Sequence, residues 1–307
     1  MNSLKKLLTF ALVLLASNQI YTKDIITITE QELQSGGQNL EIKLRQAARD
    51  GFFYVQIPTK AQDLIAHGLD FANNFYKDTH FTSLVDLPKF TGYRKHEHSQ
   101  VEGFYCEREF WHELYPAEVA QLADCFNNLS LDLFRKIVPL VLDQLPVEKY
   151  NQATGGLYND RGMYHFEFKH YRTEQAEIGI NPHQDTGYIT LLFIDKKGLY
   201  VKINDIWQPV PPKPGYLIVN FGGTFEILVN DKNKLQASWH FVERITPEKH
   251  GGDRINFALF SNNSLDVPAQ RALVTGELEV VCASYQEFLE KTFLTVYQQM
   301  DIPEIRE

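Results

Sequence analysis

The sequence predicts a mixed α and β fold in which helices flank a β-sandwich or a jelly-roll barrel. Residues 164–260 alternate apolar and polar side chains with a repeat of two, and turn residues divide them into short segments. The first half of the chain instead carries long apolar patterns with helical spacing. With 307 residues, of which 44% are hydrophobic, the chain can bury one substantial core with helices packed outside it.

Helices and short strands alternate in the first part of the chain. A helix ends at Gly51, and the last and longest helix contains Pro139, which lacks the N–H of the helix ladder and is expected to bend it. The expected elements are, in order, a strand at 25–29, a helix at 40–50, a strand at 52–55, and helices at 63–76 and 117–145.

Residues 90–111 separate the two long helices and resemble a loop, because they show no clear period. Tyrosine, phenylalanine and histidine are dense here, so the segment is interpreted either as a solvated connection or as the wall of a pocket.

The second half is predicted to consist of strands separated by glycine, proline, asparagine and lysine turns. The expected strands are 164–171, 188–194, 199–203, 216–221, 225–228, 237–245 and 254–260. Ser284 and Glu287 then form a capping box for a final helix whose apolar positions are Leu289, Phe293, Val296 and Met300.

The N-terminal segment 1–22 has two lysines followed by a short apolar run, the pattern of a secretory signal that is too short to span a bilayer. A docked apolar helix is the alternative, so the protein is either exported or cytoplasmic. The remaining chain divides into a strand and helix region at 23–150, a barrel core at 151–275, and a C-terminal strand and helix at 276–307.

Charge and cysteine content exclude several classes of partner. The net charge is −9 and no long basic run occurs, which argues against nucleic-acid binding. No stable membrane insertion of the mature chain is expected. Three widely spaced cysteines suggest neither a disulfide framework nor a cysteine metal site. The oligomeric state is not readable from the sequence.

His183 and Asp185 lie two residues apart at the start of a β-rich run. Side chains two residues apart on extended backbone point the same way, so both can reach one metal ion. His240 in a later strand offers a third ligand. Two histidines and one carboxylate leave coordination positions open, which is the arrangement of non-haem Fe(II) oxygenases.

Arg254 begins the strand 254–260 and shares a face with Asn256, Ala258 and Phe260. An unpaired buried charge costs several kcal/mol, so a guanidinium in a barrel needs a partner. The partner is either the carboxylate of a ligand, which matches the planar fork of arginine, or an internal carboxylate such as Glu226 or Glu243.

The order His-x-Asp, a histidine some fifty-five residues later and then Arg-x-Ser or similar resembles the iron- and 2-oxoglutarate-dependent dioxygenases of the isopenicillin N synthase-like type, with Asn256 standing where the family usually has Ser. The resemblance runs from about residue 24 to residue 297. It includes the segments 51–55, 92–110, 198–201 and 219–222, and it implies a double-stranded β-helix, or jelly-roll, barrel flanked by helices.

The resemblance also assigns roles to residues. His183, Asp185 and His240 would be the ligands of Fe(II), and Arg254, with Asn256 and Tyr171, would bind 2-oxoglutarate. The substrate candidates are Tyr93, Arg94, Phe104 and Tyr105. The implied enzyme is a non-haem iron dioxygenase that consumes O2 and 2-oxoglutarate, oxidises a small substrate by hydroxylation, desaturation or cyclisation, and releases succinate and CO2.

Three alternatives stay open at this point. The first is an oxidase of the same fold that does not use 2-oxoglutarate. The second is a barrel that binds a metal or a ligand without catalysis. The third concerns His96-Glu97-His98, which could form a second metal site or could face either solvent or the substrate entrance.

Overall fold

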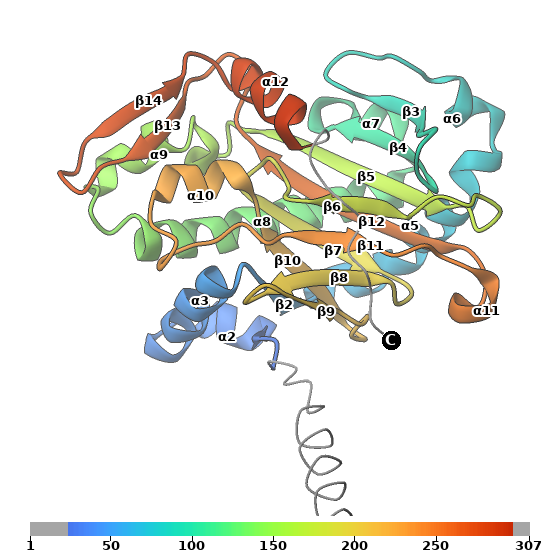
Figure 1. Cartoon of the computed structure of the whole chain (residues 1–307), viewed down its shortest axis with the longest axis horizontal. Helices are drawn as coiled ribbons and strands as arrows, with labels where there is room; N and C mark the ends of the chain where they lie inside the picture. Colours follow the sequence, from blue (N-terminus) through green and yellow to red (C-terminus); the bar gives the residue numbers. More distant parts are fainter. Residues whose placement is uncertain (1–23, 297–307) are drawn as a thin grey trace, which may run out of the picture.

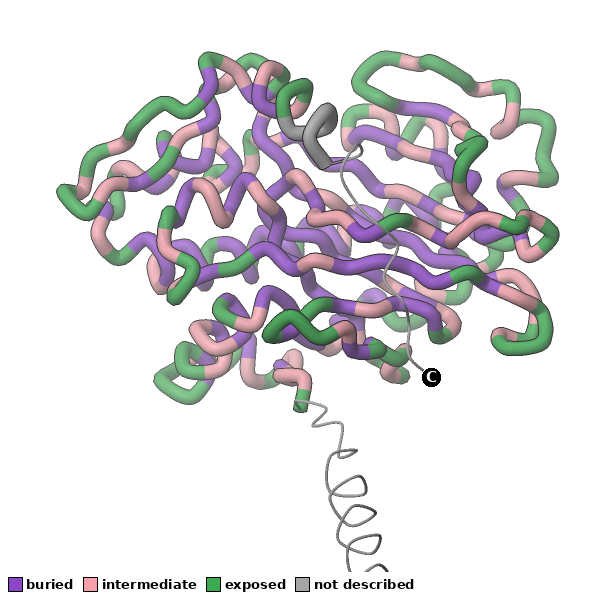
Figure 2. The backbone as a smooth tube through the Cα atoms, in the orientation of Figure 1, coloured by how far each residue is buried: buried purple, intermediate pink, exposed green. Residues whose placement is uncertain are grey.

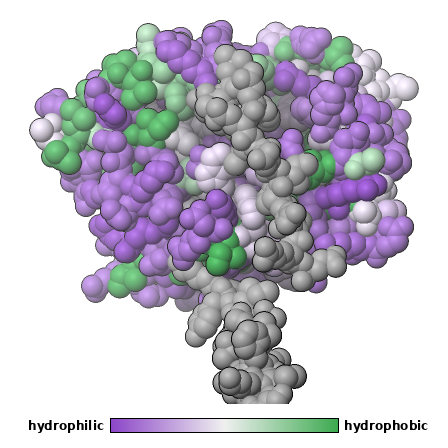
Figure 3. Space-filling view, in the orientation of Figure 1, coloured by the Kyte–Doolittle hydropathy of each residue, from purple (hydrophilic) through white to green (hydrophobic). Residues whose placement is uncertain are grey.

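The computed structural model describes residues 24–296, in which a large sheet is covered on one face by helices and on the other by a smaller sheet (Figure 1). Apolar residues of the two sheets form one buried cluster, and this establishes that the sheets face each other. The jelly-roll prediction is confirmed. Hydrophilic side chains cover much of the face seen in Figure 3.

The large sheet has eight strands, the smaller sheet has four, and a hairpin stands apart. The large sheet consists, in spatial order, of β1 (Thr27–Ile28), β2 (Phe52–Gln56), β10 (Tyr216–Phe221), β7 (Ile189–Ile194), β12 (Arg254–Asn262), β5 (Met163–Tyr171), β4 (Val101–Glu107) and β3 (Gly92–Lys95). The smaller sheet consists of β6 (Ile180–His183), β11 (His240–Val242), β8 (Leu199–Ile203) and β9 (Ile206–Pro209). The hairpin consists of β13 (Ala269–Ala272) and β14 (Leu278–Cys282).

Two helices, α5 (Leu64–Asn74) and α8 (Ala117–Val141), pack against the outer face of the large sheet at β12 and β7. The other α-helices are α2 (Glu30–Ser35), α3 (Gln38–Asp50), α4 (Thr59–Gln62), α6 (Thr79–Ser83), α7 (Trp111–Leu114), α9 (Tyr150–Ala153), α10 (Gly223–Val229), α11 (Pro247–His250) and α12 (Tyr285–Val296). Short 3-10 helices are η1 (Phe75–Lys77), η2 (Arg108–Phe110), η3 (Val147–Lys149) and η4 (Leu157–Asn159).

The two faces of the large sheet have different chemistry because side chains alternate along each strand. On β12, Phe257 points outward into the helix-covered core, where its ring stacks on Phe193 with centroids 4.5 Å apart. The alternate residues Arg254, Asn256 and Ala258 point inward, toward the smaller sheet. Figure 2 shows that the strands are buried along most of their length. The polar inner face is therefore enclosed rather than solvated.

Most of the predicted elements are present. The helices expected at 40–50, 63–76 and 117–145 correspond to α3, α5 and α8, although α8 already ends at Val141. The strands expected at 25–29 and 237–245 are much shorter than predicted. Glu287 N–H donates to the Ser284 hydroxyl at the start of α12, as the capping box requires, and Met300 lies outside the described residues.

Two predictions are wrong. Residues 225–228 belong to the helix α10 rather than to a strand, because Phe225 and Leu228 lie three apart and both are buried on one helix face. Residues 90–111 are not a loop, since they contain β3 and β4, which extend the sheet beyond β5. The strands β6, β9 and β13 were not predicted, whereas β14 corresponds to the C-terminal strand expected within 276–307.

The predicted signal segment 1–22 lies outside the described residues. Within residues 24–296, no helix combines the length and the apolar character needed to cross a membrane. The division near residue 150 stays a prediction, although β1 to β4 join the same sheet as the later strands.

Replacing Phe257 by alanine tests the helix-facing core. Phe257 is fully buried between the sheet and the helices, so Phe257→Ala should lower the free energy of unfolding by about 3–5 kcal/mol through lost burial and a new cavity. Val274 is 96% exposed, and Val274→Ala should change the free energy of unfolding by no more than about 0.5 kcal/mol. Urea denaturation followed by far-UV circular dichroism measures both, and equal effects would contradict this assignment of the core.

Candidate metal and ligand site

His183 and His240 lie directly opposite each other in the antiparallel pair of β6 and β11. Each imidazole bonds the carbonyl two residues before it: His183 Nδ1 is 2.8 Å from Asn181 O, and His240 Nδ1 is 3.0 Å from Ser238 O. A carbonyl only accepts, so both Nδ1 atoms donate and both Nε2 atoms keep a free lone pair. These bonds fix the tautomer and the orientation of two rings prepared to bind a metal.

Asp185 completes the cluster from the segment that follows β6. Its Oδ1 lies 3.7 Å from His183 Nε2 and 3.6 Å from His240 Nε2. Its Oδ2 accepts a 2.7 Å hydrogen bond from the Thr190 hydroxyl on β7. A residue of the large sheet therefore orients the carboxylate, while the two histidines come from the smaller sheet.

The segment after Asp185 is held against the start of α10. Gly223 N–H donates to Asp185 O at 2.7 Å. A Cβ atom on Gly222 would lie only 2.2 Å from Gly187 O, so glycine is needed where the two segments meet. This close packing limits the movement of the Asp185 backbone.

Burial sets the charge states of the cluster. Burial, followed by the neighbouring His240, lowers the pKa of His183 to about 4, so the imidazole is neutral near pH 7. Burial raises the pKa of Asp185, but both imidazoles and the Thr190 hydroxyl outweigh it, and the net pKa lies below the ordinary value. A neutral histidine and an ionised aspartate are the forms that bind metals.

The cluster fits a divalent first-row metal ion. Asp185 Oδ1 lies 3.7 Å from His183 Nε2 and 3.6 Å from His240 Nε2, and ligand atoms each about 2.0–2.2 Å from a common ion would be at most about 4.4 Å apart. The donor set is two imidazoles and one carboxylate, which leaves other coordination positions open. In the described part of the chain it is the one such group of histidine, cysteine and acidic residues, so no second metal site at His96 and His98 is supported.

Arg254 lies on the inner face with no exposed surface. Its Nε donates weakly to Lys196 O at 3.4 Å, and its guanidinium lies over the Tyr171 ring, 4.6 Å from the centroid. Neither terminal nitrogen has a hydrogen-bond partner in the protein. Burying an unpaired cation costs several kcal/mol, so these nitrogens point to an anionic ligand.

The internal ion pair considered for Arg254 is not present. Glu226 accepts from Ala237 N–H and pairs with Lys232, while Glu243 pairs with Lys249 and His250. Asn256 donates to the Tyr171 hydroxyl at 3.0 Å and leaves its Oδ1 without a partner. The three residues predicted to bind the cosubstrate are thus adjacent.

A pocket of about 500 Å³ opens beside the metal cluster. Arg94 and Tyr105, two of the predicted substrate residues, line it with His183 and Asp185. The prediction for Tyr93 and Phe104 is corrected: these two residues pair across β3 and β4 but face the opposite side of the sheet. Tyr93 donates to Glu102 there, and Phe104 is fully buried in the helix-facing core.

Two supporting residues were not predicted. Thr190 is the single polar residue of the apolar strand β7, and this was a signal that a buried hydroxyl had a specific partner. Asn220 lies beside Thr190 on β10, faces the same way, and has no partner for either amide atom. Nothing local marks Asn220, because its neighbour comes from a strand distant in sequence.

Comparisons with known proteins agree on one family. Residues 158–263 match the family model described as the 2OG-Fe(II) oxygenase superfamily. Scopoletin 8-hydroxylase of Arabidopsis thaliana is 28% identical over 187 residues, which are 59% of this chain and 49% of the relative. A protein of Dianthus caryophyllus named "Probable 1-aminocyclopropane-1-carboxylate oxidase" is 25% identical over 272 residues, 83% of this chain and 82% of the relative.

The fold has solved counterparts. The crystal structure of a full-length Neurospora crassa protein in complex with alpha-KG and thymine superposes with a TM-score of 0.70 and 17% identity, over 88% of this chain and 97% of that one. At this identity the likeness shows the fold. The chain spans about half the length, or less, of the first curated relatives that it matches.

Replacing Asp185 or Thr190 tests the metal site. Asp185→Ala should abolish stoichiometric Fe(II) binding, because it removes a charged ligand. Thr190→Val should weaken metal affinity by about 10–100-fold, since it removes the hydroxyl that orients Asp185. Anaerobic titration with Fe(II) measures both, and Thr275→Val on the exposed hairpin turn is the matched control. Stoichiometric binding by Asp185→Ala would rule out this ligand set.

Proposed function

Because residues 158–263 match the family model of the 2OG-Fe(II) oxygenase superfamily, we propose that the protein is an oxygenase that oxidises a small organic molecule with Fe(II), 2-oxoglutarate and O2. One observation carries the proposal. The inner face holds both an open cluster of two histidines and one aspartate, and a buried arginine whose terminal nitrogens have no partner. A dicarboxylate that reaches from the metal to Arg254 would satisfy both.

The proposed overall reaction is balanced. For a hydroxylation, the substrate, O2 and 2-oxoglutarate give the hydroxylated product, succinate and CO2. One oxygen atom enters the product and the other enters succinate. When bound, Fe(II) supplies the redox chemistry that activates O2 and that the side chains cannot supply themselves. Hydroxylation, desaturation and cyclisation give different products. Which of them occurs depends on which carbon of the bound substrate lies nearest the metal site.

The protein's own residues bind and orient the reactants. His183, Asp185 and His240 hold the metal in fixed orientation through the two backbone carbonyls and Thr190. Arg254 pairs with the distal carboxylate of the cosubstrate by two parallel hydrogen bonds. Asn256 contributes a further polar contact next to it. Preorganised positions of this kind lower the entropic cost of bringing reactants together.

The pocket suits a small, partly apolar substrate. Its volume of about 500 Å³ is within the usual range of ligand pockets, about 300–1,000 Å³. Met163, Ile180, Phe260 and Leu289 supply its apolar wall. Thymine, bound in the Neurospora structure, is a small ring compound of a size that such a pocket accommodates.

An oxidase of the same fold that does not use 2-oxoglutarate is the second candidate. It would leave the buried nitrogens of Arg254 without a ligand, and this observation favours the 2-oxoglutarate-dependent reaction. A non-catalytic metal-binding barrel would bind Zn(II) tightly and consume no O2.

Succinate release tests the proposed function. Wild-type protein should form succinate from 2-oxoglutarate only when both Fe(II) and O2 are present. Without the organic substrate, succinate should still form, but slowly. Arg254→Met keeps the bulk of the side chain but removes its charge, and should raise the KM for 2-oxoglutarate by about 10–100-fold, since hydrogen bonds to charged groups contribute about 1.5–3 kcal/mol.

Arg49→Met is the matched control, because Arg49 is exposed on α3. An unchanged KM in Arg254→Met would assign the cosubstrate to other residues. Iron-loaded wild-type protein that forms no succinate would favour the oxidase or the non-catalytic barrel.

A further inference from the structure

We infer that Arg94 recognises the substrate and that the substrate carries a carboxylate group, an inference that rests on the proposed function. Arg94 lies on β3 at the edge of the large sheet, and its side chain lines the pocket that contains the metal cluster. The charged side chains that line this pocket determine which kind of ligand it can bind.

The sheet register places two cations around one ring. Arg94 pairs with Gly103, and Gly103 pairs with Lys169 on the next strand, so the three residues form one row on the inner face. A Cβ atom on Gly103 would lie 2.9 Å from the Tyr105 ring, so this ring occupies the space above the glycine. Arg94 and Lys169 contact the ring, 5.6 and 5.9 Å from its centroid.

The two cations differ in their partners. Lys169 Nζ lies 3.0 Å from Glu167 Oε2, and both side chains are largely buried, so this pair is neutral within the pocket. No described carboxylate lies within 4.0 Å of the Arg94 guanidinium. Asp185 belongs to the metal cluster and Glu97 is exposed. Arg94 is therefore the cation of this pocket whose charge no described side chain neutralises.

The guanidinium of Arg94 contacts two aromatic rings. Its Cζ lies 5.6 Å from the centroids of both Phe90 and Tyr105. Phe90 has a φ of +59°, which is uncommon for an aromatic residue, and it belongs to a turn in which Lys89 also has a positive φ of +54°. Attraction to the rings orients the guanidinium while its N–H groups stay available to an acceptor.

The class of ligand follows from these features. The planar fork of arginine matches a carboxylate with two parallel hydrogen bonds, and a single unpaired cation balances a single negative charge. The apolar wall that includes Met163 and Phe260 suits the body of an amphiphilic molecule. The inferred substrate is thus a small monocarboxylic acid with an apolar or aromatic body, bound by its carboxylate at Arg94 and presenting its body to the metal.

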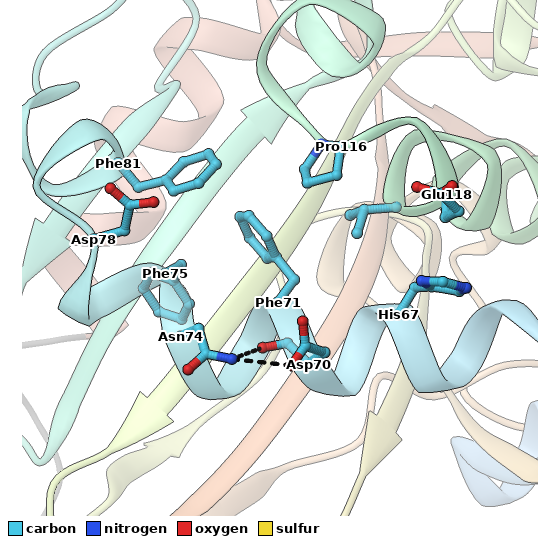
Figure 4. A pocket seen from close by; sticks show the side chains of 10 residues that line it. His67, Asp70, Phe71, Asn74, Phe75, Asp78, Phe81, Pro116 and Glu118 are labelled. Carbon is cyan, nitrogen blue, oxygen red and sulfur yellow. Dashed lines mark hydrogen bonds between the residues drawn. The ribbon is translucent and has the colours of Figure 1, made fainter.

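A second cavity has the opposite charge. It has a volume of about 140 Å³, lies on the helix side between α5 and the start of α8, and is lined by Asp70, Asp78 and Glu118 (Figure 4). Carboxylates around a cavity repel an anion. The pocket at Arg94 is therefore the better site for the acid.

Matched acids and amides test the inference. The protein is loaded with Fe(II) and saturated with 2-oxoglutarate under anaerobic conditions, so that nothing is consumed. Calorimetric titrations then use phenylacetate, indole-3-acetate and 4-phenylbutanoate, each beside its primary amide. Wild-type protein should bind at least one acid about ten-fold more tightly than its amide, because only the acid forms charge-assisted hydrogen bonds with the guanidinium.

The variants assign that preference to Arg94. Arg94→Gln should reduce the preference to less than about two-fold, and Arg94→Lys should retain part of it, since lysine keeps the charge but not the fork. Lys95→Gln is the matched control, because Lys95 is the exposed neighbour of Arg94 on β3 and does not line the pocket. Each variant is compared with wild type for its thermal unfolding midpoint and its affinity for 2-oxoglutarate.

Three outcomes would overturn the inference: no wild-type preference for any acid, an unchanged preference in Arg94→Gln, or weaker binding of 2-oxoglutarate by Arg94→Gln, which would place Arg94 in the cosubstrate site. The proposed function fails separately, if wild-type protein forms no succinate. The titrations repeated without 2-oxoglutarate then still measure acid binding at Arg94.

Discussion

The antiparallel pairing of β6 with β11 is the interaction on which the site depends. It places His183 opposite His240, and each ring donates to a carbonyl two residues earlier in its own segment. A shift of this register by one residue would turn one imidazole to the other face of the sheet. The strand register and the hydrogen bonds to backbone carbonyls together orient the two imidazole rings. The geometry of the cluster is therefore set by the folded strands and not by a bound metal ion alone.

The smaller sheet alone does not complete the cluster. Asp185 is oriented by Thr190, a residue of the large sheet, so the metal ligands depend on the distance between the two sheets. That distance is maintained by a shared apolar cluster that includes Val201 and Val242 from one sheet and Leu192 and Ile218 from the other. Packing between the sheets therefore controls both the stability of the barrel and the geometry of the cluster.

The outer and inner faces of the large sheet have different roles. Its outer face packs phenylalanines such as Phe168 and Phe257 against α5 and α8 and provides most of the burial that stabilises the fold. Its inner face buries Arg254 fully and Lys169 largely, where charges are costly, and places Arg94 on the wall of the open pocket. Lys169 is neutralised by Glu167, whereas the terminal nitrogens of Arg254 have no partner in the protein. Apolar burial on the outer face offsets the free-energy cost of the buried charges on the inner face. Bound ligands can then neutralise the charges that have no partner in the protein.

The sequence alone determined those features that depend on residues close together in the chain. The spacing of His183 and Asp185, the alternation that puts Arg254 and Asn256 on one face, and the helices α3, α5 and α8 all follow from local patterns. Only the tertiary structure decided that residues 92–107 form a hairpin at the sheet edge, because that hairpin is defined by its pairing with β5. The same pairing turned Arg94 and Tyr105 toward the pocket and Tyr93 and Phe104 away from it. The partner of Arg254 was also decided by the tertiary structure, since distant segments place Glu226 and Glu243 in other ion pairs and leave the terminal nitrogens of Arg254 without a hydrogen bond. Local periodicity determines which side chains share one face of a strand. Pairing between strands distant in sequence determines whether that face contacts the pocket or the core.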